Sequence, residues 1–361
     1  MPCARCETLP FSPADRGSLV VTAPVPELIR KVVEFVDRQE LPHQVEERAV
    51  ILPDASLLEV LCRMRDARFF NALERRDILA VLLRDGEALS VQTITRTRTL
   101  ERWLGLLEAR ALLEVLEARR FVAWFQPIVA AGSGEVIGYE SLLRGRKPDG
   151  SLMFPGEIFG AAATNDLLFQ VDRQARETAL RCASEQGIRG QIFVNFVPTA
   201  IYDPAHCLQN TLAVARRLGI APGQIVFEVI ETERVEDMRH LQHILDFYRA
   251  SGFRIALDDV GSGYASLSLL AMLRPDIIKV DMEIVRGIHQ DSDRQAIFRA
   301  LVGIARDLGI QVLAEGVETR EEYDYVVAQG ADLLQGYLFA RPAQVPPAIQ
   351  PVPPRPAPGH T

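Results

Sequence analysis

Long hydrophobic runs are absent from this sequence, and cysteine is scarce. No stretch approaches the ~18 consecutive apolar residues of a membrane-spanning helix, so no membrane association is expected. The first residues, Met1–Cys6, lack the basic-then-apolar order of a secretory signal, and a cytoplasmic location is expected. Five cysteines without regular spacing do not make a disulfide framework, so we expect reduced thiols.

Positive charge is also in short supply. The 361 residues carry a formal net charge of −8, which argues against a protein that binds DNA or RNA polymers. A small phosphorylated ligand held through metal ions stays compatible with that charge. Among 40 basic residues only Lys31, Lys147 and Lys279 are lysines. A chain that otherwise uses arginine can place lysine where a compact, titratable ammonium group is needed.

Residues 1–98 are predicted to form a small mixed α/β module with a regulatory role and an unknown ligand. Apolar residues recur at helical spacing over Pro26–Arg38, Ser56–Met64 and Leu73–Leu83, and Ser90–Thr95 is predicted to be a strand. Cys3 and Cys6 have CxxC spacing, but a zinc site would need two more ligands. The nearest candidates are Cys62 and His43, and because neither belongs to a second paired motif, free thiols or a redox pair are favoured.

Residues 99–120 are predicted to be a connecting helix, because apolar residues form a helical stripe from Leu100 to Arg120. Such a helix could pair between the subunits of a homodimer. Packing against its own domain is favoured, since the heptad pattern is imperfect and covers only about three repeats.

From residue 121 to 342, strand-like runs alternate with amphipathic helical stretches. Eight strands with intervening helices, over a length close to the usual ~250 residues, favour a (β/α)8 TIM-like barrel. An open doubly wound sheet competes, but no glycine-rich dinucleotide fingerprint follows the first strand. The predicted strands are Phe121–Val129, Val136–Leu143, Gln191–Val197, Ile225–Ile230, Arg254–Asp259, Ile277–Val280, Gln311–Glu315 and Leu333–Phe339. Residues 343–361 are rich in proline and are predicted to be a disordered tail, with a PxxP docking motif as the less favoured alternative.

Polar residues interrupt these strands, mostly near their carboxyl ends. In a barrel those ends meet at one rim, where the side chains would lie together. Without a metal such a cluster of carboxylates would repel itself, whereas Mg²⁺ or Mn²⁺ prefers carboxylate and amide oxygens. Each acid taken singly is better explained as a solvated or capping residue, but the set together favours a metal site. Its members are Glu140, Asn195, Glu228, Asp258, Asp259, Lys279, Glu315 and Gln335.

Several motifs of this chain resemble those of a known protein family. The segment Glu140-Ser141-Leu142-Leu143-Arg144 resembles the signature of EAL-domain cyclic-di-GMP phosphodiesterases, with Ser141 in place of the usual Ala. The resemblance covers about Leu113 to Pro342 and implies a two-metal hydrolase that opens cyclic di-GMP to linear pGpG. Further matching segments are Phe125–Val129, Val194–Asn195, Phe227–Glu231, Asp258–Gly263, Ile278–Asp281, Ala314–Glu318 and Gln335–Phe339.

The resemblance also implies a role for each matched residue. Asp258 and Asp259 would serve a second metal, and Glu315 would join the metal shell or act as a base beside it. Two Mg²⁺ or Mn²⁺ ions per site can lower the pKa of a water and stabilise an in-line displacement at phosphorus. The residues that would hold the first metal are Glu140, Asn195, Glu228 and Asp258.

Further residues would act around the metals. By the same resemblance, Lys279 would orient or polarise the attacking water, with a structural lysine as the alternative. Arg144 would pair with a substrate phosphate, since its guanidinium fork fits phosphate oxygens. Gln126 and Gln335 would lie near the substrate, and Gln335 could instead arrange the metal shell. Glu231 would anchor the loop from Asp258 to Gly263.

Two residues of that loop depart from the family pattern. Val260 replaces the usual Phe, and Ser262 replaces the more common Thr. Both changes leave the metal ligands intact and bear on how the loop packs and couples to a subunit interface.

Two other functions compete with the enzyme. One is a catalytically silent cyclic-di-GMP receptor, which is disfavoured because every expected metal ligand is present. The other is an interaction scaffold that works through the amino-terminal module and the proline-rich tail.

Overall fold

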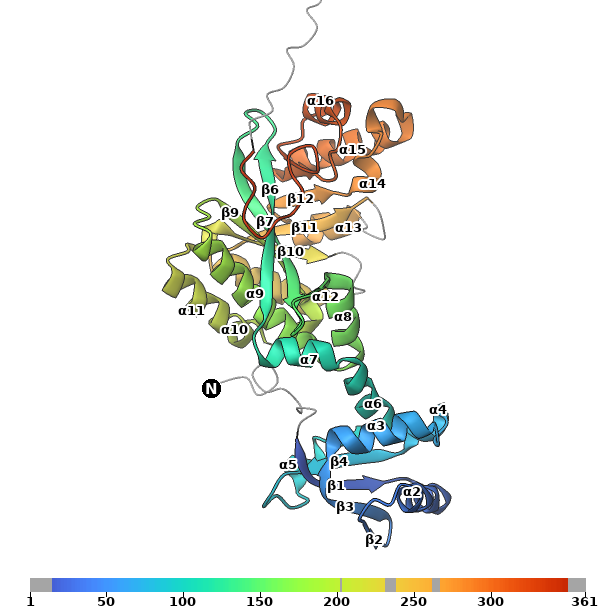
Figure 1. The fold of residues 1–361 in the computed structure, drawn as a ribbon. Helices are drawn as coiled ribbons and strands as arrows, with labels where there is room; N and C mark the ends of the chain where they lie inside the picture. Colours follow the sequence, from blue (N-terminus) through green and yellow to red (C-terminus); the bar gives the residue numbers. More distant parts are fainter. Residues whose placement is uncertain (1–14, 202, 231–237, 262–266, 350–361) are drawn as a thin grey trace, which may run out of the picture.

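The computed structural model describes residues 15–201, 203–230, 238–261 and 267–349. These residues form an amino-terminal part and a barrel, joined by short helices (Figure 1). The amino-terminal part contains a five-stranded sheet in the order β2-β3-β1-β4-β5. No helix among the described residues is long and apolar enough to cross a membrane.

Helices cover one face of the amino-terminal sheet. Apolar stripes of α2 (Pro26–Arg38) and α3 (Leu57–Ala67) pack on Leu19 and Val21 of the central strand β1 (Arg16–Thr22). The two helices expected there are therefore present. The other elements of this part are β2 (Gln44–Glu46), β3 (Ala49–Ser56), α4 (Ala72–Asp77), β4 (Leu79–Leu83), α5 (Val91–Ile94) and β5 (Arg98–Thr99).

The helix predicted over Leu73–Leu83 is wrong in its second half. Helix α4 ends at Asp77, and β4 then pairs antiparallel with β1. The continuous apolar run of β4 is compatible with a buried helix or a buried strand. Pairing with β1 decides for the strand, whose side chains alternate between the helix-covered face and the opposite face.

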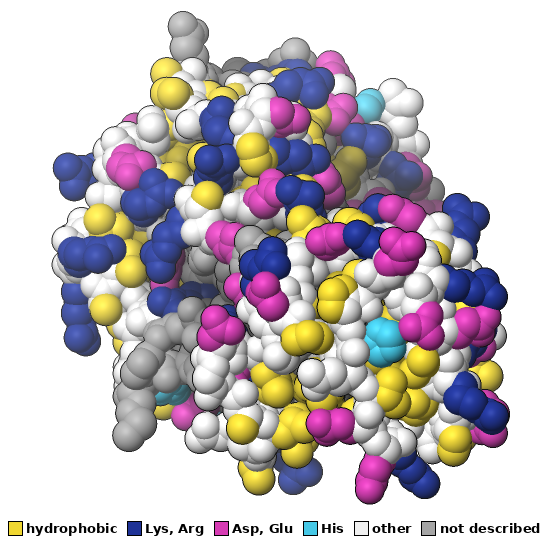
Figure 2. All heavy atoms as spheres, turned by 60° about the horizontal axis from the view of Figure 1, so that its bottom comes forward, with side chains coloured by type: hydrophobic (Ala, Val, Ile, Leu, Met, Phe, Trp, Pro, Cys, Tyr) yellow, Lys and Arg dark blue, Asp and Glu magenta, His cyan; other side chains and the backbone are white. Residues whose placement is uncertain are grey.

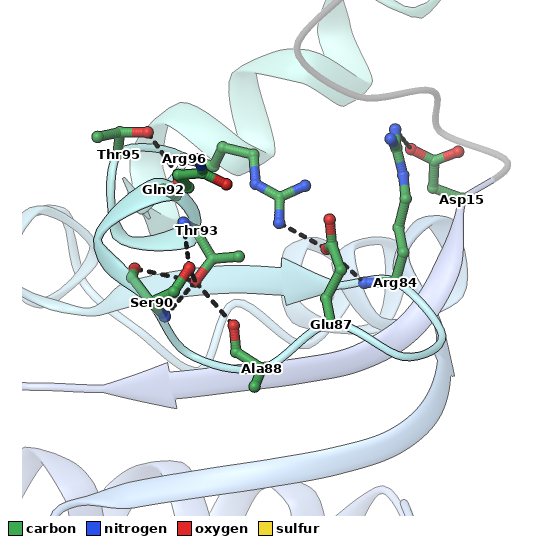
Figure 3. Close-up of polar contacts among 9 residues, drawn as sticks. All are labelled: Asp15, Arg84, Glu87, Ala88, Ser90, Gln92, Thr93, Thr95 and Arg96. Carbon is green, nitrogen blue, oxygen red and sulfur yellow. Dashed lines mark hydrogen bonds and ion pairs between the residues drawn. The ribbon is translucent and has the colours of Figure 1, made fainter.

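The strand predicted over Ser90–Thr95 is also wrong, because this segment contains the helical turn α5. The Ser90 hydroxyl accepts a hydrogen bond from the Thr93 N–H at 3.2 Å, and the Thr93 hydroxyl accepts one from the Ser90 N–H at 2.7 Å (Figure 3). This reciprocal capping starts a helix. Val91 and Ile94, three residues apart, are both exposed instead of alternating between faces.

The connecting helix is divided in two. Helix α6 (Leu100–Glu108) ends and α7 (Arg110–Glu117) begins at Ala109, whose φ of −82° and ψ of 6° are not helical. Trp103 of α6 is fully buried and donates to the Ala80 carbonyl of β4 at 3.0 Å. Gly145, in the first hairpin of the barrel, leaves room for Val115 of α7. Each helix therefore packs on a different part of the chain.

The predicted barrel is confirmed. Its eight strands close through pairing of the first with both the second and the last. They are β6 (Phe121–Ala130), β7 (Val136–Arg146), β9 (Gln191–Phe196), β10 (Ile225–Ile230), β11 (Arg254–Val260), β12 (Ile277–Val280), β13 (Gln311–Ala314) and β14 (Leu333–Gln335), and the short β8 (Leu152–Met153) extends the sheet beside β7.

Strand β6 departs from the parallel arrangement of the other barrel strands. Strand β6 is antiparallel to both of its neighbours, β7 and β14, while the strands from β7 to β14 in the closed barrel run parallel. Only residues 131–135 join β6 to β7, which is too short for the helical crossover that a parallel pair needs. The first unit of the barrel is therefore a hairpin.

Helices surround the barrel, as Figure 1 shows. The described helices are α8 (Pro155–Thr164), α9 (Leu168–Glu185), α10 (Pro204–Cys207), α11 (Gln209–Leu218), α12 (Met238–Ala250), α13 (Leu267–Leu273), α14 (Met282–Val285), α15 (Ser292–Leu308) and α16 (Arg320–Gln329), with 3-10 turns at Pro198–Ala200, Pro222–Gln224 and Ile288–Gln290.

A layer of apolar side chains fills the inside of the barrel. It takes one residue from each of seven strands and is separate from the larger core between strands and helices. Because side chains alternate along a strand, the residue two positions further on also points inward. The layer consists of Ile128, Phe193, Val226, Ala256, Ile277, Leu313 and Leu333.

A second core joins the amino-terminal part to the barrel. Buried residues continue from Leu19 of β1 through Trp103 and Leu112 of the connector to Leu143 of β7 and Val171 of α9. On the face seen in Figure 2, basic and acidic side chains are intermingled rather than separated by sign.

The predicted tail begins against the barrel. The N–H groups of Phe125 and Ala343 each donate to the other residue's carbonyl, at 2.7 and 3.1 Å. Tyr139 donates to the Pro347 carbonyl at 3.5 Å. The first part of the predicted tail, residues 343–349, therefore contacts the barrel strands. Residues 350–361 lie outside the described residues.

Candidate functional site

The candidate site forms the next inward-facing layer of the barrel. Each of its members on β9 to β12 and on β14 lies two residues beyond a member of the apolar layer, and Glu315 follows the end of β13 in the same way. Gln126 precedes Ile128 by two because β6 runs in the opposite direction. The residues brought together are Gln126, Glu140, Asn195, Glu228, Asp258, Lys279, Glu315 and Gln335.

Lys279 is the centre of this layer. Its ammonium nitrogen lies 2.7 Å from Glu228, 2.9 Å from Glu315 and 3.0 Å from Asp258. Glu140 is more distant, at 4.0 Å. The side chain of Lys279 is 1% exposed, so these charges interact with little screening by water.

Amide side chains hold Glu140 from the other side. Gln335 donates to one carboxylate oxygen of Glu140 at 2.6 Å, and Asn195 donates to the other at 3.3 Å. Gln335 also donates to the side-chain amide oxygen of Gln126 at 3.1 Å. The structure thus places Asn195 and Gln335 against Glu140, and Gln126 next to Gln335.

Asp258 and Asp259 both reach the site although they are neighbours in one strand. Regular alternation would send them to opposite faces. Asp259 has a positive φ of 56°, and the pairing of β11 with β12 shifts register between Leu257 and Val260. This local turn brings carboxylate oxygens of Asp258, Asp259 and Glu315 within 4.8 Å of one another, a grouping that could hold a metal ion.

The electrostatics show an excess of negative charge. Burial raises the pKa of Glu228 well above its usual range and that of Glu315 to about 8, although Lys279 acts in the opposite direction. Burial, followed by Asp258, raises the pKa of Asp259 to about 6. Burial alone would lower the pKa of Lys279, but the four surrounding carboxylates hold it well above its usual value.

A cavity of about 290 Å³ opens onto this layer. Glu140, Asp259, Glu315, Gln126 and Gln335 form part of its wall. Four of the remaining wall residues have polar side chains and were not predicted from the sequence as site residues, although three of them lie in matched motifs. The four are Asp281, Arg286, Glu318 and Tyr337.

Arg144 does not line that cavity. Its guanidinium lies between the rings of Trp124 and Phe154, 5.3 and 5.1 Å from their centroids, and donates to the Leu143 carbonyl at 2.8 Å. Burial lowers its pKa, while Glu140 opposes that effect. Arg144 faces the same side of β7 as Glu140, four residues along the strand.

Several predicted features are not placed. Glu231, Ser262 and Gly263 lie outside the described residues, as do Cys3 and Cys6. Val260 is described: it is 2% exposed and belongs to the core between the strands and the helices.

A second cavity, of about 430 Å³, lies between α8, α9 and the strands β7 and β9. Its wall is mainly apolar, with Leu142, Phe159 and Val194 among its residues. Asn195 belongs to this wall and also contacts Glu140, so the second cavity adjoins the acidic layer.

Known structures share this barrel. A standalone EAL protein from Vibrio cholerae O395, solved with c-di-GMP bound, is 38% identical with a TM-score of 0.59, and the match covers 64% of this chain and 96% of that one. Klebsiella pneumoniae BlrP1, solved with manganese and cyclic di-GMP, is 25% identical with a TM-score of 0.56, and the match covers 91% of this chain and 97% of that one.

Curated relatives match the same region. The bifunctional diguanylate cyclase/cyclic di-GMP phosphodiesterase MucR of Pseudomonas aeruginosa is 32% identical over 234 residues, which are 64% of this chain and 34% of MucR. The probable cyclic di-GMP phosphodiesterase PdeG of Escherichia coli is 33% identical over 61% of this chain and 44% of PdeG. This chain thus spans less than half the length of these relatives. The family model described as the EAL domain matches residues 109–342, and this chain belongs to the EAL domain family.

Proposed function

We propose that the barrel hydrolyses cyclic di-GMP to linear pGpG with two Mg²⁺ or Mn²⁺ ions. The observation that carries this proposal is the buried layer of carboxylates around Lys279, open to a cavity. Relatives named as cyclic di-GMP phosphodiesterases and structures of EAL domains with that dinucleotide support the substrate.

The donor set fits divalent cations. Apart from Lys279, no donor among the described residues reaches either oxygen of the fully buried Glu228. Five carboxylates against one ammonium group leave a charge that hard cations with oxygen ligands would balance. The residues proposed to hold them are Glu140, Asn195, Glu228 and Asp258 for one ion, Asp258 and Asp259 for the other, and Glu315 at their edge.

When bound, such a pair of ions supplies an activated water and stabilises charge on the oxygens around phosphorus. The protein's own groups perform the remaining tasks. Lys279 holds a proton at the centre of the acids and orients the water through its ammonium group. Gln335 and Asn195 fix both oxygens of Glu140. Glu315 is proposed to act as a base beside the metals, because its carboxylate lies in this layer 2.9 Å from the Lys279 ammonium group.

The substrate is proposed to extend beyond the acidic layer. Gln126 and Gln335 lie at the cavity wall, where they can meet it. Arg144 is proposed to contact a phosphate from the neighbouring part of β7, and Glu231 to anchor the loop from Asp258 to Gly263. A homodimer, regulation through residues 1–98 and a cytoplasmic location complete the proposal.

The core shared by the two parts supports the regulatory proposal. It connects β1 of the amino-terminal sheet to β7, the strand that carries Glu140 and Arg144, without an intervening flexible linker. A ligand that altered the packing of Trp103 would therefore act on the barrel through the packed side chains of this core.

One assay separates the enzyme from the silent receptor. The purified chain is incubated with cyclic di-GMP and Mg²⁺ or Mn²⁺, and pGpG is measured by chromatography. Tight binding of cyclic di-GMP without turnover would refute the enzyme hypothesis and support the receptor hypothesis. The scaffold alternative is tested in the cell, because a truncated chain without residues 1–98 and 343–361 that still functions fully would exclude it.

A further inference from the structure

The cavity above the acidic layer is short of positive charge. Among the described residues that line it, Arg286 is the only basic one. Lys279 lies behind the carboxylates and is 1% exposed, so it is not available at the wall. A ligand with more than one phosphate would find a single guanidinium group there. The acidic residues of the wall are Glu140, Asp259, Asp281, Glu315 and Glu318.

The backbone of Arg286 is fixed from two sides. Arg286 follows the short helix α14, and its carbonyl accepts a hydrogen bond from the guanidinium of Arg294. The next N–H, that of Gly287, donates to the Glu322 carboxylate at 2.8 Å. These contacts determine where the Arg286 side chain leaves the main chain.

Glu322 ties this turn to the loop after β13. Its second carboxylate oxygen accepts from the N–H groups of Glu318 and Thr319, at 2.9 and 3.0 Å. Glu322 is 3% exposed; burial alone would raise its pKa, but the hydrogen bonds from Gly287, Glu318 and Thr319 hold it below its usual value. One buried carboxylate therefore sets the spacing of two wall residues, Arg286 and Glu318.

The guanidinium of Arg286 makes one ion pair and keeps other N–H groups available for a ligand. One terminal nitrogen donates to Glu318 at 3.0 Å, and no other contact of the guanidinium with a described residue is present. The side chain is 54% exposed, and Arg286 belongs to the cavity wall. A guanidinium oriented in this way can bind phosphate oxygens with two parallel hydrogen bonds.

We propose that Arg286 binds the second phosphate of a two-phosphate substrate while the first lies over the acidic layer. This inference rests on the proposed function, since cyclic di-GMP carries two phosphates in one ring. An exposed ion pair such as that between Arg286 and Glu318 contributes little to stability by itself. The lone basic side chain in an acidic wall, fixed by Arg294 and Glu322, favours recognition of the ligand instead.

The test compares two substrates. Arg286→Ala is expected to raise KM for cyclic di-GMP about tenfold and to leave kcat within about twofold, because a charge-assisted contact outside the reacting centre is lost. KM for bis(4-nitrophenyl) phosphate, which has one phosphate, should not change. Arg286→Lys should restore part of the affinity. Arg299→Ala, which removes an exposed arginine bonded to Tyr325, is the matched control and should leave both substrates unaffected.

An unchanged KM for cyclic di-GMP in Arg286→Ala would overturn the assignment. An equal rise in KM for both substrates would do the same, since it would show a general disturbance of the site. If the wild type does not turn over cyclic di-GMP, the proposed function fails, and calorimetric Kd values for cyclic di-GMP with Ca²⁺ decide the role of Arg286. A tenfold weaker Kd in Arg286→Ala, with unchanged thermal unfolding, supports it.

Discussion

Replacing Lys279 by Met tests whether the acidic layer depends on this one ammonium group. The substitution keeps the length and the apolar part of the side chain but removes the charge that lies within 3.0 Å of Glu228, Asp258 and Glu315. Because the side chain is 1% exposed, water cannot take its place at low cost. Without metal ions, the variant is expected to be less stable than the wild type. With metal ions, it is expected to show no turnover.

The size of the effect depends on pH. Removing one partner of a buried ion pair costs about 3–5 kcal/mol, and at the low end this corresponds to a fall in Tm of about 6–12 °C for a barrel of this size. The loss should be largest near pH 8.5, where the carboxylates must be ionised. Near pH 5.5 it should shrink, because Glu228 and Glu315, whose pKa values are already raised, take up protons instead.

Differential scanning calorimetry in EDTA at both pH values measures this difference. Saturating Mn²⁺ should narrow the gap between the variant and the wild type, since divalent cations also neutralise the carboxylates. Equal Tm values for both proteins in EDTA at pH 8.5 would refute the reasoning, because they would mean that the acids do not need Lys279. Turnover by the variant at the wild-type rate would refute its catalytic assignment.

Three further predictions follow from the same site. Glu140→Ala should abolish pGpG formation while the circular dichroism spectrum stays unchanged, and retained turnover would show that the layer is assigned wrongly. Metal-free wild type should lose stability as the pH rises from about 5 to 8, since a carboxylate with a raised folded-state pKa, such as Glu315 at about 8, favours the folded state only while it is protonated. The rise in Tm on adding Mn²⁺ should accordingly be larger at pH 8 than at pH 6. A rise in Tm that is independent of pH would contradict this. Gly316→Ala should lower both Tm and activity, because the residue has φ +67° and a new Cβ would lie 2.3 Å from that of Met282; the control Gly303→Ala, in a helix with free space around it, should be neutral or stabilise by up to ~1 kcal/mol, and equal behaviour of the two variants would count against the argument.

Much of the barrel could be predicted from the sequence because its strands are short apolar runs with clear boundaries. Ile225–Ile230 and Ile277–Val280 were predicted with the bounds that β10 and β12 have. The positions of Asn195, Glu228 and Lys279 near the carboxyl ends of their strands also predict that they share one rim. These signals are local, so a linear sequence contains them.

Apart from the locally capped turn at Ser90–Thr95, the errors arose where a segment's partner lies far away in the chain. Leu79–Leu83 is a strand because β1 pairs with it, and the connector breaks at Ala109 because its halves pack on different parts. Arg286 escaped notice as a wall residue because its place depends on Glu322, 36 positions later, through the intervening Gly287.

The sequence by itself determined the chemical inventory and the family: carboxylates, an amide and a rare lysine at the ends of successive strands. Only the tertiary structure decided how close these groups lie and how much water reaches them. It placed Lys279 among three acids, turned Asp259 toward Asp258 through a positive φ, and kept Arg144 out of the cavity that Arg286 enters. The physical reason is that charge interactions and pKa values depend on distance and burial, which closure of the barrel sets and no local pattern encodes.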